Sequence, residues 1–386
     1  MRVRISRVAR QSASKRPVIF PFPGDFNVPP CRAVPGTATC RRFRKVTRNT
    51  KVTKSSRGTP MSIRTRVVLA LSSLLLAPLV RAEPPPSARP VIREDQIKKL
   101  GEQRLADPLV RVDQLKKLSA HVSIIPDGGV PLVPNVGFIL GDKALLVVDT
   151  GLGARNGAAV ARVAERLAGK RRIYLVTTHA HPEHDLGAQA FPANITMIRS
   201  EGEEKDIAES GLSLAQMFSR MSPVNAELLK DARFREADIT FQDTLDLDLG
   251  ALRVRLLAFG PNHTRGDTGV WIEADRVLFS GDVAMQYTAA FASPSSTFAH
   301  WRKTLDEVEA LKPSIIVPSH GPVGGLEFVA GYRDFFTAIQ ERTVAAKKAG
   351  RTEDQAVAEI TKDLSGRYLD PMRLDWAIRA AYAEFN

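Results

Sequence analysis

The amino-acid sequence predicts an α/β fold, because strand-like and helix-like segments alternate from residue 121 to about residue 320. Short apolar runs of three to six residues, typical of buried strands, end in turns that contain glycine, proline, aspartate or asparagine. Between two of these runs, residues 157–168 carry apolar side chains at helical spacing. Together these patterns favour strands that are connected through helices.

The expected elements follow in chain order. Residues 121–125 form a first strand that ends in Pro-Asp-Gly-Gly, and residues 136–140 and 144–148 form a hairpin around a Gly-Asp turn. Residues 157–168 form a helix, and residues 173–177 form a short apolar strand. Three further strands are expected from the apolar runs at residues 254–259, 277–279 and 315–317.

The distribution of charge argues against a nucleic-acid partner. The chain has 386 residues, with 55 Lys and Arg against 42 Asp and Glu, a formal charge of +13. Residues 1–60 hold 15 of the basic residues and one acid, Asp25, so residues 61–386 hold 40 basic and 41 acidic residues. The main part of the chain therefore lacks the basic excess that attracts polyanions, and a small-molecule substrate is expected instead.

The N-terminal region contains an export signal pattern that begins at Met61. Residues 61–66 are basic, residues 67–80 are apolar, and the Val-Arg-Ala that ends at residue 82 resembles a cleavage site. We interpret residues 61–82 as a signal peptide, which predicts a periplasmic or secreted protein, and residues 1–60 as a non-native or disordered extension. An Arg-rich transit segment is the alternative interpretation. The apolar run is too short for a stable membrane span.

Three segments follow the expected signal. Residues 83–120 begin with a Pro-rich stretch and continue with a charged, weakly helical pattern, which predicts a linker and surface helices. Residues 121–326 form the main domain, and residues 327–386 form a mostly helical C-terminal extension. Both cysteines, Cys31 and Cys40, precede the signal, so residues 83–386 cannot use a thiolate as a nucleophile or ligand.

Side chains that can bind a metal follow four of the expected strands. His179, His181 and His184 lie directly after residues 173–177, in the sequence THAHPEHDLG. The carboxyl ends of strands in an open α/β sheet line one crevice, so we expect these side chains to converge with those that follow the later strands. Imidazole and carboxylate groups bind zinc at roughly 2.0–2.2 Å. The later strands are each followed by one such residue: His263, Asp282 and His320.

This pattern resembles that of the metallo-β-lactamase superfamily, in which H-x-H-x-D-H is followed by a His, an Asp and a His, each after a strand. The resemblance implies an αββα four-layer sandwich and makes residues 121–326 the catalytic domain, with a site for two metal ions at one edge. It also implies which residues bind the metals: His179, His181 and His263 for the first ion, His184 and His320 for the second, and Asp282 as a bridge between them.

Two acidic residues near these ligands are also to be compared with the superfamily pattern, Glu183 and Asp149. The Asp of H-x-H-x-D-H is Glu183 here, and the extra methylene moves its oxygens by about 1.5 Å. Either the loop has adjusted and Glu183 binds the second metal, or Glu183 acts as a base, so one or two zinc ions are expected. Asp149, in VVDTG, matches a supporting residue of the superfamily, which we expect beside the ligands.

The resemblance implies a zinc-dependent hydrolase. Bound zinc lowers the pKa of water from 15.7 to about 7, so a hydroxide forms without a protein nucleophile. We expect Asp282 to orient this hydroxide and Glu183 to serve as a metal ligand or as a base. A bridging Asp282 is typical of the branches of the superfamily that hydrolyse thioesters and lactones, so the expected substrate is an ester, thioester, lactone or related acyl compound.

Three alternatives remain open. Export is compatible with a β-lactam-hydrolysing enzyme. A di-iron redox protein on the same fold is the second alternative, although that branch has a carboxylate where His181 stands. A non-catalytic metal-binding protein is the third. The sequence leaves the oligomeric state open.

Residues 200–235 include an amphipathic helix. Leu214, Met217, Phe218 and Met221 are spaced at i, i+3, i+4 and i+7, which favours packing against the core. The alternative is a flexible apolar lid over the metal site, because methionine side chains adapt to varied shapes.

Overall fold

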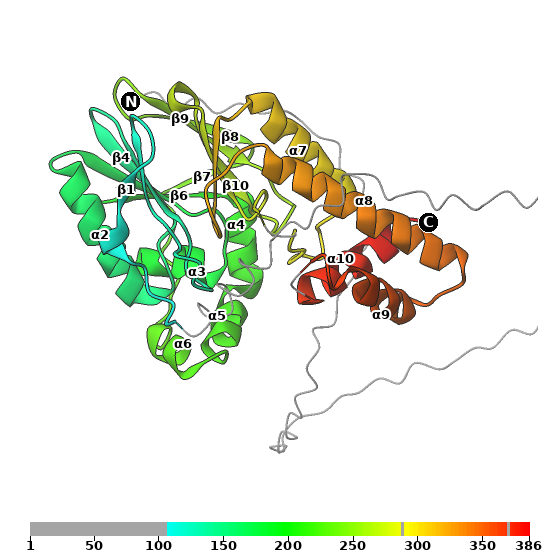
Figure 1. The fold of residues 1–386 in the computed structure, drawn as a ribbon. Helices are drawn as coiled ribbons and strands as arrows, with labels where there is room; N and C mark the ends of the chain where they lie inside the picture. Colours follow the sequence, from blue (N-terminus) through cyan, green and yellow to red (C-terminus); the bar gives the residue numbers. More distant parts are fainter. Residues whose placement is uncertain (1–105, 287–288, 369–370) are drawn as a thin grey trace, which may run out of the picture. The chain divides into compact units, whose positions relative to one another are not determined.

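The computed structural model describes residues 106–286, 289–368 and 371–386 (Figure 1). The predicted extension (1–60), the predicted signal peptide (61–82) and the first part of the predicted linker lie outside these residues. In the part of the chain that the structure describes, no helix is both long enough and apolar enough to cross a membrane.

The first sheet has seven strands in the order β1-β2-β3-β4-β5-β6-β7. Strands β1 to β4 pair antiparallel, which includes the expected hairpin of β3 and β4, and β4 to β7 pair parallel. The strands are β1 (Lys116–Lys117), β2 (Val122–Ile125), β3 (Val136–Leu140), β4 (Ala144–Val148), β5 (Arg172–Val176), β6 (Thr196–Ser200) and β7 (Ile239–Phe241).

The second sheet has five strands in the order β12-β11-β10-β9-β8. Its first four strands in the chain pair antiparallel, whereas β11 and β12 are parallel neighbours. The parallel pair brings the carboxyl ends of β11 and β12 to the same edge of the sheet. The strands are β8 (Thr244–Asp248), β9 (Arg253–Ala258), β10 (Thr268–Ile272), β11 (Val277–Gly281) and β12 (Ile315–Pro318).

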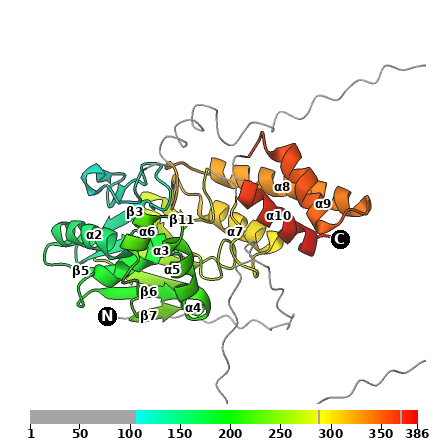
Figure 2. The same cartoon turned by 90° about the horizontal axis from the view of Figure 1, so that it is seen from below.

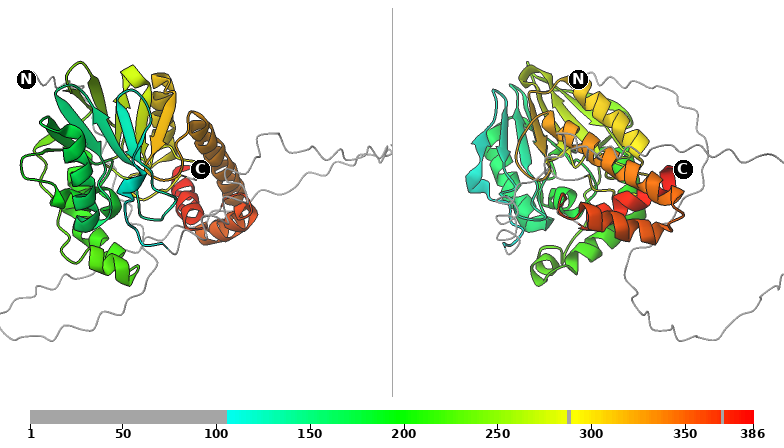
Figure 3. Two further views of the ribbon diagram at one scale, coloured as in Figure 1. Left: turned by 60° about the vertical axis from the view of Figure 1, so that its left-hand side comes forward. Right: turned by 45° about the vertical axis from the view of Figure 1, so that its right-hand side comes forward.

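The two sheets pack face to face, and helices cover their outer faces (Figure 1 and Figure 3). Leu146 and Val176 of the first sheet share one buried cluster with Leu256 and Val270 of the second. Helix α2 (Gly153–Ala168) covers the first sheet, and α7 (Phe298–Leu311) and α8 (Glu327–Lys348) cover the second. Because both faces of β4 are covered, all five of its residues are buried, which explains its uninterrupted apolar sequence. The predicted αββα sandwich is confirmed.

The predicted C-terminal helices are α8, α9 (Glu353–Leu364) and α10 (Pro371–Glu384), which lie together with α7 (Figure 2). Trp301 of α7 is fully buried in the cluster that also contains Tyr332 of α8 and Leu374 of α10. At the other end of α10, Glu384 accepts hydrogen bonds from the backbone N–H groups of Phe298 and Ala299, at 2.6 and 2.9 Å. A carboxylate is favoured there because the first turn of α7 leaves N–H groups without helical partners.

Two local predictions differ from the structure. Surface helices were expected within residues 83–120, but the described end of this segment forms the 3₁₀ turn η1 (Val112–Gln114) and the edge strand β1 instead. The two exposed lysines of β1 are typical of edge strands, where charge prevents further pairing. The helix expected at residues 157–168 begins earlier, at Gly153, because Gly151 and Gly153 adopt φ values of 86° and 74° that turn the chain from β4 into α2.

Short helices occupy the segment between β5 and β7. They lie beside the carboxyl ends of the first sheet, with α3 and α5 close together (Figure 2). These elements are α3 (Pro182–Asp185), the 3₁₀ helix η2 (Leu186–Ala190), α4 (Glu201–Asp206), the π-helical turn η3 (Ile207–Gly211), α5 (Leu212–Ser219) and α6 (Pro223–Leu228).

Candidate metal centre

Four strand ends bring the candidate ligands to one place. Strand β5 is followed by a turn that carries His179 and His181 and then by α3, which carries His184. Pro182 occupies the first turn of α3, where a backbone N–H has no helical acceptor, so the helix begins directly after His181. The other three ligands follow β9, β11 and β12. Nitrogen and oxygen atoms of the seven predicted residues lie in three overlapping groups, each within 4.8 Å, so the predicted convergence is confirmed.

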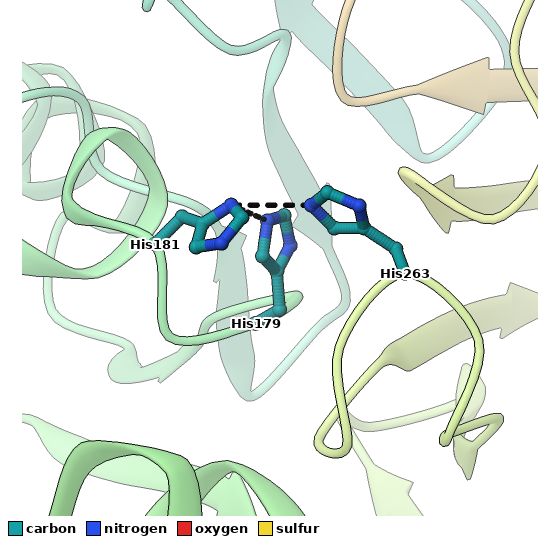
Figure 4. Close-up of side chains that lie close together, drawn as sticks. All are labelled: His179, His181 and His263. Atoms are coloured by element: carbon teal, nitrogen blue, oxygen red, sulfur yellow. Dashed lines mark hydrogen bonds between the residues drawn. The ribbon is translucent and has the colours of Figure 1, made fainter. Parts of the chain in front are cut away.

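The first cluster consists of His179, His181 and His263 (Figure 4). The Nδ1 atom of His181 lies 3.1 Å from Nε2 of His179 and 3.1 Å from Nε2 of His263. Ligand atoms around a tetrahedral zinc ion are separated by roughly 3.3 Å when each metal–nitrogen bond is about 2.0–2.1 Å. The three ring nitrogens are therefore spaced as a zinc ion requires.

The second cluster consists of Glu183, His184 and His320. The Nε2 atoms of the two histidines lie 3.2 Å apart, and Oε1 of Glu183 lies 3.8 and 3.9 Å from them. The other oxygen of Glu183 is buried and has no hydrogen-bond partner among the described residues. A buried carboxylate oxygen without a donor is costly unless a cation is bound, so this cluster also fits a metal ion.

Asp282 lies between the two clusters. Its carboxylate is 3.5 Å from Nε2 of His263 in the first cluster and 4.0 Å from Nε2 of His320 in the second. Oδ1 of Asp282 is likewise buried without a hydrogen-bond partner in the described part of the chain. This is the position that a bridging carboxylate requires.

Three of the imidazoles are oriented by acceptors behind them. Nδ1 of His184 donates to Asp149 at 3.0 Å, Nδ1 of His263 donates to the carbonyl of Ala290 at 2.7 Å, and Nδ1 of His320 donates to the carbonyl of Val133 at 3.0 Å. A proton on Nδ1 leaves Nε2 with a free lone pair that faces the centre. The structure places Asp149 beside the ligands, as predicted.

The histidines of the centre differ in the direction in which their pKa values are shifted. Burial, together with neighbouring imidazoles, lowers the pKa of His179 and His181 well below 6.5. Burial also acts to lower the pKa of His184, but the charge and hydrogen bond of Asp149 outweigh it and raise this pKa to about 9. Burial acts to raise the pKa of Asp282, but the electrostatic influence of the neighbouring imidazoles of His320, His263 and His184 lowers it strongly, so the carboxylate is ionised.

A buried ion pair supports the turn from behind. Arg199 of β6 donates two hydrogen bonds to Asp185, at 2.7 and 3.0 Å, and its Nε lies 3.9 Å from Glu203. All three side chains are almost fully buried. Asp185 therefore faces Arg199 and not the ligand clusters. Nothing in the local sequence indicated Arg199, because its partner precedes it by 14 residues.

The amphipathic segment of α5 has two different faces. Phe218 is buried, and its ring centroid lies 6.0 Å from that of His181. Met217 and Met221 are 38% and 53% exposed, so the core packing predicted for these two methionines is wrong. The apolar side chain of Phe218 forms one wall beside the first cluster, while the two methionines face solvent.

The comparisons with known proteins agree with the fold. Residues 129–320 match the family model of the metallo-β-lactamase superfamily, and this region of the chain belongs to that superfamily. The solved sec-alkylsulfatase Pisa1 from Pseudomonas sp. shares the fold, with a TM-score of 0.56 over 75% of this chain and 54% of its own, at 14% identity.

Two characterised relatives show what similar chains do. The chain is 24% identical over 258 residues to a linear primary-alkylsulfatase from Pseudomonas sp., a match that covers 56% of this chain and 48% of the relative. It is 26% identical over 162 residues to the human acyl-coenzyme A thioesterase MBLAC2, covering 39% of this chain and 57% of the relative. The chain thus spans about half of the length of these relatives.

Proposed function

We propose that this protein is a zinc-dependent hydrolase. The observation that carries the proposal is the pair of ligand clusters that meet at Asp282. Five imidazoles and two carboxylates are donor types that zinc accepts. The buried oxygens of Glu183 and Asp282 that lack donors among the described residues fit bound cations. Hydrolytic relatives of the same superfamily support the assignment.

Zinc bound here would supply a hydroxide at neutral pH and polarise the bond under attack. His179, His181 and His263 would hold the first ion. Asp282 is ionised at neutral pH, so its carboxylate can accept a hydrogen bond from the attacking water and orient it. The five histidines remain neutral ligands only while deprotonated at the coordinating nitrogen, which couples metal binding to pH.

For Glu183 we propose the role of ligand to the second ion, together with His184 and His320, rather than that of a base. Its Oε1 is nearly equidistant from the two Nε2 atoms, which is the place of a third ligand. Burial raises the pKa of Glu183, and a bound cation would restore the ionised form. The longer side chain of Glu therefore substitutes for the Asp of the superfamily pattern.

We propose an ester-type bond attached to an acyl or alkyl chain as the substrate. The named activities of the relatives, alkylsulfatase and acyl-coenzyme A thioesterase, both concern such compounds. The apolar ring of Phe218 beside His181 favours a substrate with an apolar part. A carboxylic ester or thioester is the first choice, and an alkyl sulfate ester is the second because of the sulfatase relatives.

For localisation, we propose export to the periplasm or the medium. The proposal depends on the signal pattern of residues 61–82, which precedes the described residues. N-terminal sequencing of the exported protein tests it, with a mature end near Glu83 as the expected result. A mature end far from Glu83 contradicts the proposal.

A substrate panel combined with metal analysis tests the hydrolase. The zinc-loaded protein is assayed with esters, thioesters, lactones, alkyl sulfates and β-lactams. His181→Ala should lose metal and turnover together, because His181 contacts both other ligands of the first cluster. His300→Ala is the matched control, since His300 hydrogen-bonds the carbonyl of Phe259 and belongs to neither cluster. Turnover that persists in metal-free His181→Ala contradicts the mechanism.

A further inference from the structure

The loop between β2 and β3 is hydrogen-bonded to the backbone on both sides of His320. Nδ2 of Asn135 donates to the carbonyls of Pro318 and Gly321, each at 2.8 Å. The backbone N–H of Asn135 donates to the carbonyl of Ser319 at 2.7 Å. Asn135 is 2% exposed, so these bonds are made away from solvent, where they hold geometry most firmly.

Asp127, in the same loop, completes the attachment. Its carboxylate accepts the backbone N–H of Gly321 at 2.8 Å, and its own N–H donates to Oδ1 of Asn135 at 2.8 Å. The loop also supplies the carbonyl of Val133, which accepts the Nδ1 proton of His320 at 3.0 Å. One loop therefore fixes both the backbone and the ring orientation of His320.

The backbone of the loop is strained next to that carbonyl. Leu132 has a φ of 62°, a left-handed conformation that is unfavourable for a branched side chain. Such conformations persist where surrounding contacts impose them, and they are concentrated at functional sites. The hydrogen bonds of Asp127 and Asn135 to residues 318–321 are contacts of this kind.

We infer that Asp127 and Asn135 are positioning residues that set the affinity of the second metal ion separately from that of the first. The inference rests on the proposed function, which assigns His320 to the second ion. Within the described residues, the hydrogen bonds of Asp127 and Asn135 reach residues 318–321 and none of the first cluster. His263 is instead oriented by Ala290, and His179 and His181 follow β5.

The test is a metal titration of Asn135→Ala by calorimetry, with zinc, and by the absorption of the cobalt-substituted protein. Loss of a supporting residue behind a metal ligand weakens metal binding by roughly 10–100-fold. We expect the second dissociation constant to rise by that factor and the first to change by less than about threefold. Asp127→Asn keeps the side-chain shape and is expected to give a smaller shift of the same kind, so it serves if Asn135→Ala fails to fold.

Asn156 provides a matched control. It is equally buried, its Nδ2 donates to the carbonyls of Pro108 and Leu152, and its Oδ1 accepts the N–H of Val110. Asn156→Ala should lose comparable stability yet keep both metal affinities. Equal loss of both affinities in Asn135→Ala, an unchanged second affinity, or a single ion in the unsubstituted protein overturns the inference. Two bound ions without turnover of any panel substrate would contradict the proposed function and leave this inference standing.

Discussion

The pair of His184 and Asp149 makes the stability of the metal-free protein depend on pH. The pKa of His184 is raised to about 9 in the folded protein, against about 6.5 for an unfolded imidazole. The pairing of protonated His184 with Asp149 therefore stabilises the folded protein fully below pH 6.5, and this stabilisation is lost as the pH rises to about 9. At 1.36 kcal/mol for each pKa unit, the full loss is about 3 kcal/mol. His179 and His181, whose pKa values are lowered, reduce the stability of the folded protein only as the pH falls below 6.5.

Asp149→Asn isolates this effect, because it removes the charge and keeps the shape. Urea unfolding of the metal-free protein is measured from pH 6 to pH 9.5 for both proteins. Across this range the unsubstituted protein should lose about 3 kcal/mol more than Asp149→Asn does, because the other buried groups that titrate are common to both proteins. Zinc should abolish the pH dependence of the unfolding free energy that His184 causes, since the ion replaces the proton on Nε2 of His184. Parallel slopes for the two metal-free proteins would refute the reasoning.

Three further predictions concern the surroundings of the centre. Arg199→Met should lower the free energy of unfolding by about 3–5 kcal/mol at pH 7, because Asp185 and Glu203 remain buried without their cation; urea unfolding checks this, and a change below about 1 kcal/mol contradicts it. Phe218→Ala should cost about 3–5 kcal/mol, whereas Met221→Ala, at a side chain 53% exposed, should cost less than about 0.5 kcal/mol. Chelation should abolish turnover and lower the unfolding temperature, with zinc restoring both; activity after verified metal removal rules out the proposed centre.

The sequence was sufficient for the features that depend on local order along the chain. Each ligand follows an apolar strand, and the ends of neighbouring strands meet, so His179, His263 and His320 could be placed together without coordinates. Predicting the αββα sandwich required further information, because the periodicity of a strand does not indicate which of the two sheets the strand joins. The superfamily resemblance supplied that information.

Other features depend on contacts that no local pattern encodes. Asn135 is about 185 residues from the carbonyls that it binds, and a single asparagine before a strand has no distinctive signal. Residues 113–118 have helix-forming side chains, yet pairing with β2 draws Lys116 and Lys117 into a strand. The helical spacing of α5 was interpreted correctly, but spacing alone does not distinguish a buried face from one that stays in solvent, as Met217 shows.

The parallel pairing of β11 and β12 has a consequence for how the centre responds to heat. Asp282 and His320 follow adjacent strands that are still joined where they end, because the N–H of Ser319 donates to the carbonyl of Gly281, the last residue of β11, at 3.0 Å. Adjacent strands are held about 4.8 Å apart by their peptide groups. The separation of Asp282 and His320 is thus determined by the backbone geometry of the paired strands. Fraying of outlying helices on warming leaves this separation unchanged, so Asp282 and His320 should stay together until the second sheet itself unfolds.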